Sequence, residues 1–232
     1  ASVDAPQLVD AIARASQARL VDFSIQDLAH TAWAFTCFDW KEPQFFLALA
    51  DALAKRLESM SEETLSQLYL VSLHFRLEWP DRNFPLSHCQ RRLQSAYRRM
   101  ESRPSRLQRD VAAALDRVGW THVFEHVAEE GLSLDMAKPA TKRAIEVDGP
   151  SHFAKTPASQ TYVENGATRF KSRLLRRLGW DVVHVPFFEW DRLVTPAEKD
   201  AYLRTRGLLT RKRPGEELSE APLPPSHHSS PE

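Results

Sequence analysis

The chain has 232 residues, of which 31 are lysine or arginine and 31 are aspartate or glutamate, so its formal net charge is zero. This balance excludes a strong overall positive field, and any nucleic-acid site must be a local patch. Its two cysteines exclude a disulfide framework and a cysteine-rich zinc module. No apolar run approaches the roughly 20 residues that span a bilayer, so we expect a soluble protein with no membrane partner.

Residues 1–100 are predicted to form a helical, repeat-like region. Apolar residues from Leu8 to Ala15 share one helix face, and apolar residues recur every four positions from Phe45 to Leu57. Between these segments, Ser24 is placed to cap the start of a helix. Pro43 suits a first helical turn, where its missing N–H costs no hydrogen bond.

Part of this region repeats itself. Apolar residues return after 37 positions, in the pairs Phe23 and Met60, Leu28 and Leu65, and Trp33 and Leu70. Such a period suggests stacked helical pairs, which bury their apolar faces against one another. The alternative is a small helical bundle with a chance similarity, and the sequence leaves both open.

A basic segment separates the two parts of the chain. From Arg91 to Arg109 there are seven arginines and one acid, Glu101. Such a run is a basic linker, a solvated helix surface or a face that contacts phosphates. The near absence of compensating acids favours the phosphate contact.

Residues 101–213 are predicted to form a small α/β domain. Helical spacing from Leu107 to Val118 ends at Gly119, because glycine suits the left-handed conformation after a helix. Three strand-like segments follow, at 121–127, 131–137 and 142–149. Residues 164–180 are a loop that leads into a helix, and the segment 181–190 contains a further strand that ends near Pro186. Enrichment in proline and serine predicts a disordered tail over 214–232. The expected fold class is therefore α+β.

Three acidic side chains lie near the ends of two neighbouring predicted strands. Glu146 and Asp148 are two positions apart in one strand, so they project from the same face. If the preceding strand pairs with it as a hairpin, Asp135 joins them. Three carboxylates at one edge can hold a divalent metal ion, and such an ion can activate water against a phosphodiester bond. The alternative is that the acids are structural.

The spacing of these acids resembles the PD-(D/E)XK nucleases, whose second motif is an acid, any residue and a lysine. Here Asp148 stands at the lysine position, and Lys171 on the inward face of the predicted helix is the candidate replacement. In a nuclease, the catalytic residues would be Asp135, Glu146, Asp148 and Lys171, and the three acids would hold Mg²⁺ or Mn²⁺. A structural role for Lys171, opposite buried acids, is the alternative.

The same predicted helix separates its arginines from Lys171. Rotation by 100° per residue sets Arg169, Arg173, Arg176 and Arg177 on the opposite arc. We expect this arc to face solvent and to contact the phosphates of RNA.

Aromatic residues follow the helix and offer either stacking surfaces for unpaired bases or core packing: Trp180, Phe187, Phe188 and Trp190. Among them, Trp190 is assigned to the RNA site. His152, which follows the turn at Gly149, is a candidate ligand, acid or base, or it stabilises the turn by a hydrogen bond. It is also assigned to the RNA site.

The strings IEVDGPSHF and NGATRFKSRLLRRLGWDVVHVPFFEW resemble the RAP domain. The resemblance covers Ile145 to about Leu193. The family's motif positions fall on Glu146, Asp148, Gly149, Pro150, His152, Lys171, Gly179, Trp180, Pro186 and Trp190.

This resemblance implies a restriction-endonuclease-like fold and a role in the RNA metabolism of mitochondria or chloroplasts. Helical repeats usually precede the domain in this family, and DLAHTAWAF is similar to the first helix of octotricopeptide or FAST-kinase-like repeats. The first ten residues show no transit peptide, so the organellar localisation rests on the resemblance.

Three hypotheses for function follow. The first is a noncatalytic module without a cofactor that binds mRNA or rRNA, as a component of an organellar ribosome or other ribonucleoprotein. The second is a metal-dependent endoribonuclease. The third is a protein-interaction scaffold, in which the helical part binds a partner protein.

Overall fold

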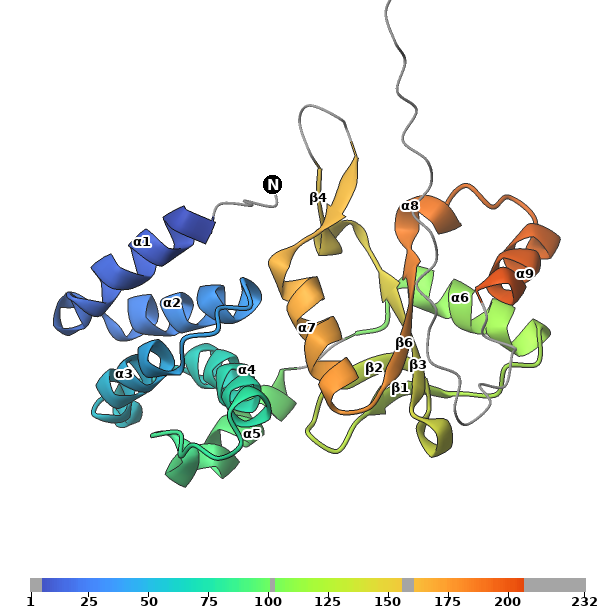
Figure 1. Cartoon of the computed structure of the whole chain (residues 1–232). Helices are drawn as coiled ribbons and strands as arrows, with labels where there is room; N and C mark the ends of the chain where they lie inside the picture. The colour runs from blue at the N-terminus through green and yellow to red at the C-terminus, as the bar shows by residue number, and fades with distance from the viewer. Residues whose placement is uncertain (1–5, 101–102, 156–160, 207–232) are drawn as a thin grey trace, which may run out of the picture.

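A computed structural model describes residues 6–100, 103–155 and 161–206 of the chain. Helices make up the first half, and the second half is a mixed sheet with helices on both faces (Figure 1), so the predicted α+β fold is confirmed. The tail predicted at 214–232 lies outside the described residues. Within them, every helix is too short or too polar to cross a membrane.

The helical half contains two similar units and a final helix. Its elements are α1 (Pro6–Gln17), η1 (Leu20–Asp22), α2 (Ile25–Cys37), α3 (Pro43–Ala54), η2 (Leu57–Ser59), α4 (Glu62–Glu78), η3 (Ser87–Cys89) and α5 (Gln90–Arg99). The elements α3, η2 and α4 each begin 37 positions after α1, η1 and α2. Ser24 and Ser61 cap the second helix of each unit, and each Oγ accepts the N–H three residues further on, at 3.1 and 3.2 Å. The sequence repeat is therefore also a repeat of helical pairs.

The second half is built on a four-stranded sheet in the order β1-β2-β3-β6. Its elements are α6 (Arg106–Arg117), β1 (Val123–Val127), β2 (Ser133–Lys138), η4 (Pro139–Thr141), β3 (Arg143–Asp148), η5 (Pro150–His152), β4 (Phe153–Lys155), β5 (Tyr162–Glu164), α7 (Gly166–Arg177), β6 (Asp181–Pro186), α8 (Phe187–Trp190) and α9 (Pro196–Thr205). The first three strands are antiparallel, and β6 pairs parallel to β3 after the crossover through α7.

The predicted order of helix, three strands, helix and strand is confirmed, but a short hairpin and two short helices were not predicted. The hairpin of β4 and β5 was missed because strands of three residues are too short to show an alternating pattern. The last predicted strand ends at Pro186 as expected, but the short helix α8 formed by the next four residues was not predicted. Helix α9 was also missed.

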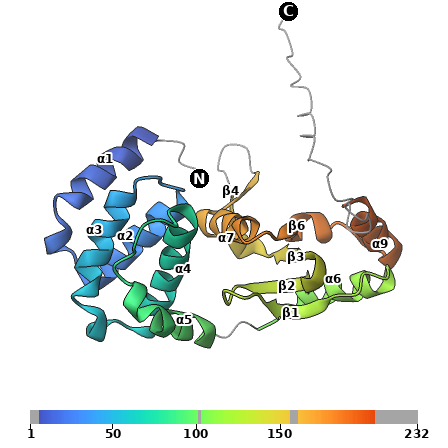
Figure 2. The ribbon, with the colours of Figure 1, turned by 60° about the horizontal axis from the view of Figure 1, so that its bottom comes forward.

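Helix α7 covers one face of the sheet, and α6 and α9 cover the other (Figures 1 and 2). Side chains of β3 point alternately to the two faces of the sheet. Ile145 and Val147 point to the face covered by α6 and belong to the apolar core there. Glu146 and Asp148 instead face the first turns of α7, where they line a pocket. The predicted projection of these two acids from one face is thus observed.

The helical half packs against the side of α7 that faces away from the sheet. The ring of Phe170 makes edge contacts with Trp33 and His74, at centroid distances of 5.2 and 5.7 Å. A Cβ atom at Gly166 would lie only 3.1 Å from the Cβ of Cys37, so α7 begins in close contact with the end of α2. The two predicted parts of the chain therefore share a core, to which Leu73 of α4 also contributes.

Candidate functional site

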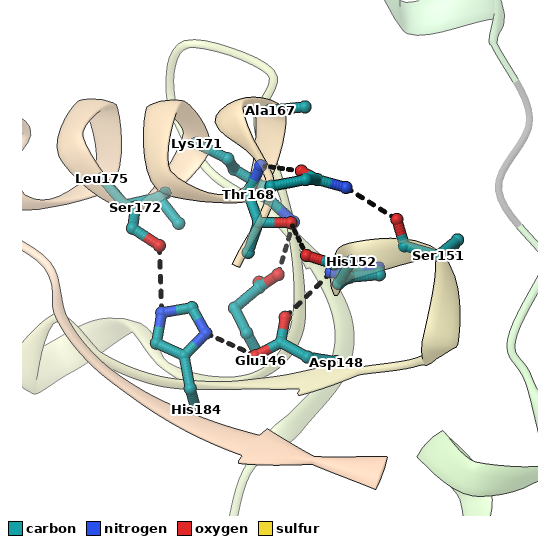
Figure 3. A pocket seen from close by; sticks show the side chains of 11 residues that line it. Glu146, Asp148, Ser151, His152, Ala167, Thr168, Lys171, Ser172, Leu175 and His184 are labelled. Atoms are coloured by element: carbon teal, nitrogen blue, oxygen red, sulfur yellow. Dashed lines mark hydrogen bonds and ion pairs between the residues drawn. The ribbon is translucent and has the colours of Figure 1, made fainter. Parts of the chain in front are cut away.

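A pocket of about 220 Å³ opens between the end of β3 and the first turns of α7. Five ionisable side chains line it: Glu146, Asp148, His152, Lys171 and His184 (Figure 3). The structure thus brings together Glu146, Asp148, Lys171 and His152, which the sequence singled out.

The cap of α7 fixes the rim of this pocket. The side chain of Asn165 accepts the Thr168 N–H at 2.9 Å and donates to the Ser151 carbonyl at 2.7 Å. The Thr168 hydroxyl donates to the carbonyl of His152 at 3.2 Å. These bonds hold the turn after β3 against the start of the helix, so the two sides of the pocket are fixed relative to each other.

Glu146 and Lys171 form a buried ion pair, with 2.5 Å between Oε2 and Nζ. Burial is the largest influence on the pKa of Lys171 and lowers it, but the charge and hydrogen bond of Glu146, together with the charges of Asp135 and Tyr97, leave the pKa above its ordinary value. Burial also raises the pKa of Glu146, against the opposing effect of Lys171. The other carboxylate oxygen, Oε1, is buried and has no hydrogen-bond partner among the described residues.

Asp148 lies between two imidazoles. Its Oδ1 is 2.8 Å from Nδ1 of His152, and its Oδ2 is 2.7 Å from Nδ1 of His184. Burial raises the pKa of Asp148. The hydrogen bonds and positive charges of His152 and His184 together lower it by more, so the pKa lies below its ordinary value. Nε2 of His184 lies 3.0 Å from the hydroxyl oxygen of Ser172, so both ring nitrogens have partners.

The same contacts raise the pKa values of both histidines. For His152, the hydrogen bond with Asp148 is the largest influence and exceeds the effect of burial. For His184, burial is the largest influence and lowers the pKa, but the hydrogen bond and the charge of Asp148 together outweigh it.

Asp135, the third acid of the predicted metal site, does not line the pocket. Its Oδ1 accepts from Nε2 of Gln108 at 2.6 Å, and its Oδ2 accepts the Val147 N–H at 2.7 Å. The ladder between β2 and β3 ends at Met136. The carboxylate of Asp135 therefore takes the place of a strand carbonyl at the end of the ladder.

The predicted three-acid centre does not fit Mg²⁺ or Mn²⁺ in this arrangement. Such ions need carboxylate oxygens that are free to coordinate. Here both oxygens of Asp135 accept hydrogen bonds outside the pocket, and Glu146 is paired with the ammonium group of Lys171. Two of the three predicted ligands are therefore not placed to share an ion with Asp148.

The predicted arginine face requires a correction. Arg173 donates to the Thr36 carbonyl, and its Nε lies 3.1 Å from Oδ1 of Asp39. Nη2 of Arg177 lies 3.0 Å from Oε2 of Glu78. Both arginines thus help to join α7 to the helical half; the side chain of Arg173 is 24 % exposed, whereas that of Arg177 is still 55 % exposed. Helical rotation separates the two sides of a helix without revealing that a second layer packs on one of them.

The other two arginines of the arc are differently placed. Arg176 is exposed and Arg169 is half-buried. Part of the arginine run before the sheet is also paired, since Arg92 and Arg99 of α5 form ion pairs with Glu58 and Glu62.

The predicted stacking residues require a second correction. Trp180 and Trp190 are 7 and 1 % exposed, and the indole N–H of Trp190 donates to Asp110 at 2.8 Å, so neither offers a face to a base. Trp180 precedes β6 and Trp190 ends α8, and each belongs to an apolar core cluster.

Phe187 and Phe188 are half-buried beside two rings of the hairpin, Phe153 and Tyr162. The rings of Tyr162 and Phe188 are nearly parallel, with 4.8 Å between centroids, and Tyr162 is 38 % exposed. Of the predicted stacking residues and the rings beside them, Tyr162 of the hairpin is therefore the most accessible, and the sequence pattern did not reveal it.

Comparison with known proteins identifies the sheet domain. Residues 145–206 match the family model of the RAP domain. This segment is a RAP domain. The match contains all five ionisable side chains of the pocket, but it does not reach Asp135.

A curated relative extends the similarity beyond the RAP domain. A chloroplastic RAP domain-containing protein of rice, Oryza sativa subsp. japonica, is 26% identical over an alignment of 204 positions, and the alignment covers 82% of this chain and 30% of the rice protein. The aligned length includes much of the helical half as well as the RAP domain. The chain spans less than a third of the length of this relative.

Of the five ionisable residues that line the pocket, sequence reasoning missed one, His184. The parallel register of β3 and β6 sets it directly beside Glu146. The available signal was a single polar residue within the otherwise apolar run VVHVP. Its partner could not be inferred, because the register of a parallel pair depends on the crossover through α7.

Proposed function

We propose that this protein binds RNA in a mitochondrion or chloroplast without cleaving it. The RAP domain and the similarity to a chloroplastic RAP domain-containing protein support the RNA-related role and the compartment. One observation carries the noncatalytic part: Lys171 compensates Glu146, and His152 and His184 compensate Asp148. The proposed ligand is mRNA or rRNA within an organellar ribosome or other ribonucleoprotein.

The proposed RNA surface uses the accessible groups of the RAP domain. Arg169 and Arg176 lie about two helical turns apart on α7, and within the described parts of the chain the ion pairs between α7 and the helical half use Arg173 and Arg177 instead. Guanidinium groups bind phosphates strongly. Tyr162 offers a partly exposed ring on which an unpaired base can stack. The side chain of His152, also assigned to the RNA site, is 37 % exposed.

The experiment measures the affinity of the full chain for a labelled single-stranded RNA at several salt concentrations. The variant Arg169→Glu/Arg176→Glu should weaken binding by at least about tenfold at low salt, and the dependence of log affinity on log salt should fall by about one for each lost phosphate contact. A matched control is Arg192→Glu/Arg204→Glu, which reverses two exposed arginines outside α7 and should bind like the unmodified protein.

The result also separates RNA binding from the scaffold hypothesis. If the unmodified chain fails to bind RNA even at low salt, or if both double variants lose the same affinity, the proposed surface is wrong. Absence of any binding would favour a protein partner for the helical half.

The endoribonuclease remains the second candidate because of the position of Lys171. Its Nζ atom reaches into the pocket from α7 and contacts Glu146, while Oε1 of Glu146 has no protein partner. Incubation of RNA with Mg²⁺ or Mn²⁺ tests this candidate. Metal-dependent cleavage that is lost in Glu146→Gln would establish it.

A further inference from the structure

Three potential metal ligands from three different strands meet beside the pocket. They are Asp148 at the end of β3, Glu164 at the end of β5 and His184 in β6, and one ligand atom of each lies within 4.8 Å of the other two. We propose that these residues form a zinc site that ties the β4–β5 hairpin to the main sheet. This inference goes beyond the proposed RNA binding, which requires no metal.

An independent observation points to a ligand at the same place. Glu146 is 3 % exposed and lines the pocket, yet its Oε1 is buried without a hydrogen-bond partner in the described structure. Glu146 pairs with His184 across β3 and β6, so both side chains project from the same face of the sheet. A buried carboxylate oxygen without a donor is costly. A water molecule held by the metal ion would supply a donor.

The ligand set favours zinc over magnesium. Zinc accepts an imidazole nitrogen together with carboxylate oxygens at about 2.0–2.2 Å, whereas magnesium prefers oxygen ligands and retains several waters. His184 supplies the nitrogen, and Asp148 and Glu164 supply the oxygens. These three protein ligands and one water would complete a tetrahedral site.

The surroundings of Asp148 suit a metal ligand. His152 contacts the second carboxylate oxygen of Asp148 at 2.8 Å, so it orients the carboxylate from behind. Such outer contacts fix the direction of metal ligands and strengthen binding.

The ligand atoms must separate slightly to admit the ion. Nδ1 of His184 lies 2.7 Å from Oδ2 of Asp148, whereas two ligand atoms of a tetrahedral zinc ion are about 3.3 Å apart. An opening of about 0.6 Å is therefore required, and the proton that lies between these atoms is released to solvent as zinc takes its place. Glu164 and His184 are only partly buried, so small rotations can provide this movement.

The site would have a structural consequence for the hairpin. Strands β4 and β5 have three residues each and form a separate two-stranded sheet. A hairpin of this size is marginally stable alone. Zinc bound by Glu164 would fasten its second strand to β3 and β6, and would hold Tyr162 in position.

The experiment titrates zinc chloride into the full chain after treatment with a chelator. All proteins carry His227→Ala and His228→Ala, which removes the adjacent histidine pair near the C-terminus. We expect one zinc ion per chain by calorimetry, and a higher midpoint of thermal unfolding with zinc than without it. Glu164→Gln and His184→Gln should each weaken zinc affinity by at least about tenfold and abolish the thermal shift.

Two further variants make the result decisive. His126→Gln removes a half-buried histidine that is not part of the ligand cluster, and it should bind zinc like the parent protein. Glu164→His retains a ligand at that position and should retain zinc binding, which separates loss of a ligand from loss of the fold. Circular dichroism checks the fold of each variant.

Three outcomes would overturn the zinc site. One is no saturable binding of zinc up to millimolar concentrations. Another is unchanged affinity in both Glu164→Gln and His184→Gln. The third is magnesium binding as tight as zinc binding, since His184 would then not be a ligand. None of these outcomes bears on RNA binding, which is measured separately in the presence of chelator.

Discussion

His74 makes the stability of the seam between the helical half and the RAP domain dependent on pH. It lies in α4, is 1 % exposed, and its ring contacts Phe46, Trp79 and Phe170 at centroid distances of 5.7, 5.8 and 5.7 Å. Burial lowers its pKa from 6.5 to about 4. Below pH 6.5 the unfolded chain therefore takes up a proton at this residue, while the folded protein does not until about pH 4.

The sign and size of the effect follow from this difference. The folded state loses stability as pH falls from 6.5 to about 4, by up to about 3 kcal/mol, since each pKa unit corresponds to about 1.4 kcal/mol. Between pH 7 and pH 5 the loss is about 2 kcal/mol. His152 and His184 act in another window: their raised pKa values give stability that is complete below about pH 6.5 and is lost as pH rises through the folded-state pKa values.

Urea unfolding at pH 7 and pH 5 measures the effect. His74→Leu replaces the imidazole by an apolar side chain that does not titrate. On going from pH 7 to pH 5, its free energy of unfolding should fall by about 2 kcal/mol less than that of the unmodified protein. The control His30→Gln removes an exposed histidine of α2 and should keep the original dependence. Equal dependence on pH in the unmodified protein and in His74→Leu would refute the reasoning.

Three further substitutions test the contacts on either side of α7. Phe170→Ala should lower the free energy of unfolding by about 3–5 kcal/mol, because the ring fills the core between the two halves; urea denaturation measures the loss, and a change below about 1 kcal/mol would contradict this packing. Arg173→Ala should cost about 1–2 kcal/mol by removing the ion pair with Asp39 and the hydrogen bond to the Thr36 carbonyl, and its RNA affinity should change less than that of Arg169→Glu/Arg176→Glu. Lys171→Met should cost about 3 kcal/mol at pH 7 by leaving Glu146 buried without a cation, and the double variant with Glu146→Gln should recover most of the loss; equal stability of the single and double variants would show that the ion pair is not the cause.

Features that depend on a few neighbouring residues could be predicted from the sequence. Ser24 caps α2 because its hydroxyl reaches an N–H three residues away. Gly119 takes a left-handed conformation with φ of 76° after α6, as expected of a glycine at the end of a helix. Glu146 and Asp148 share a face because side chains alternate along a strand.

Contacts between distant segments could not be predicted in the same way. Arg173 meets Asp39 only because α7 packs on the end of α2, and no periodicity in either helix reveals this contact. His184 reaches Asp148 through the register of β6, which depends on the whole crossover. Trp190 is buried because α9 covers the end of the sheet and contacts it through Tyr202.

The central claim is that the protein binds RNA while the carboxylates of its pocket are held by its own cations. The most direct test follows a labelled single-stranded RNA through incubation with the purified chain, in chelator and then with Mg²⁺ or Mn²⁺. We predict that the RNA is bound and stays intact under every condition. Cleavage that requires the metal ion, and that disappears in Glu146→Gln, would contradict the account.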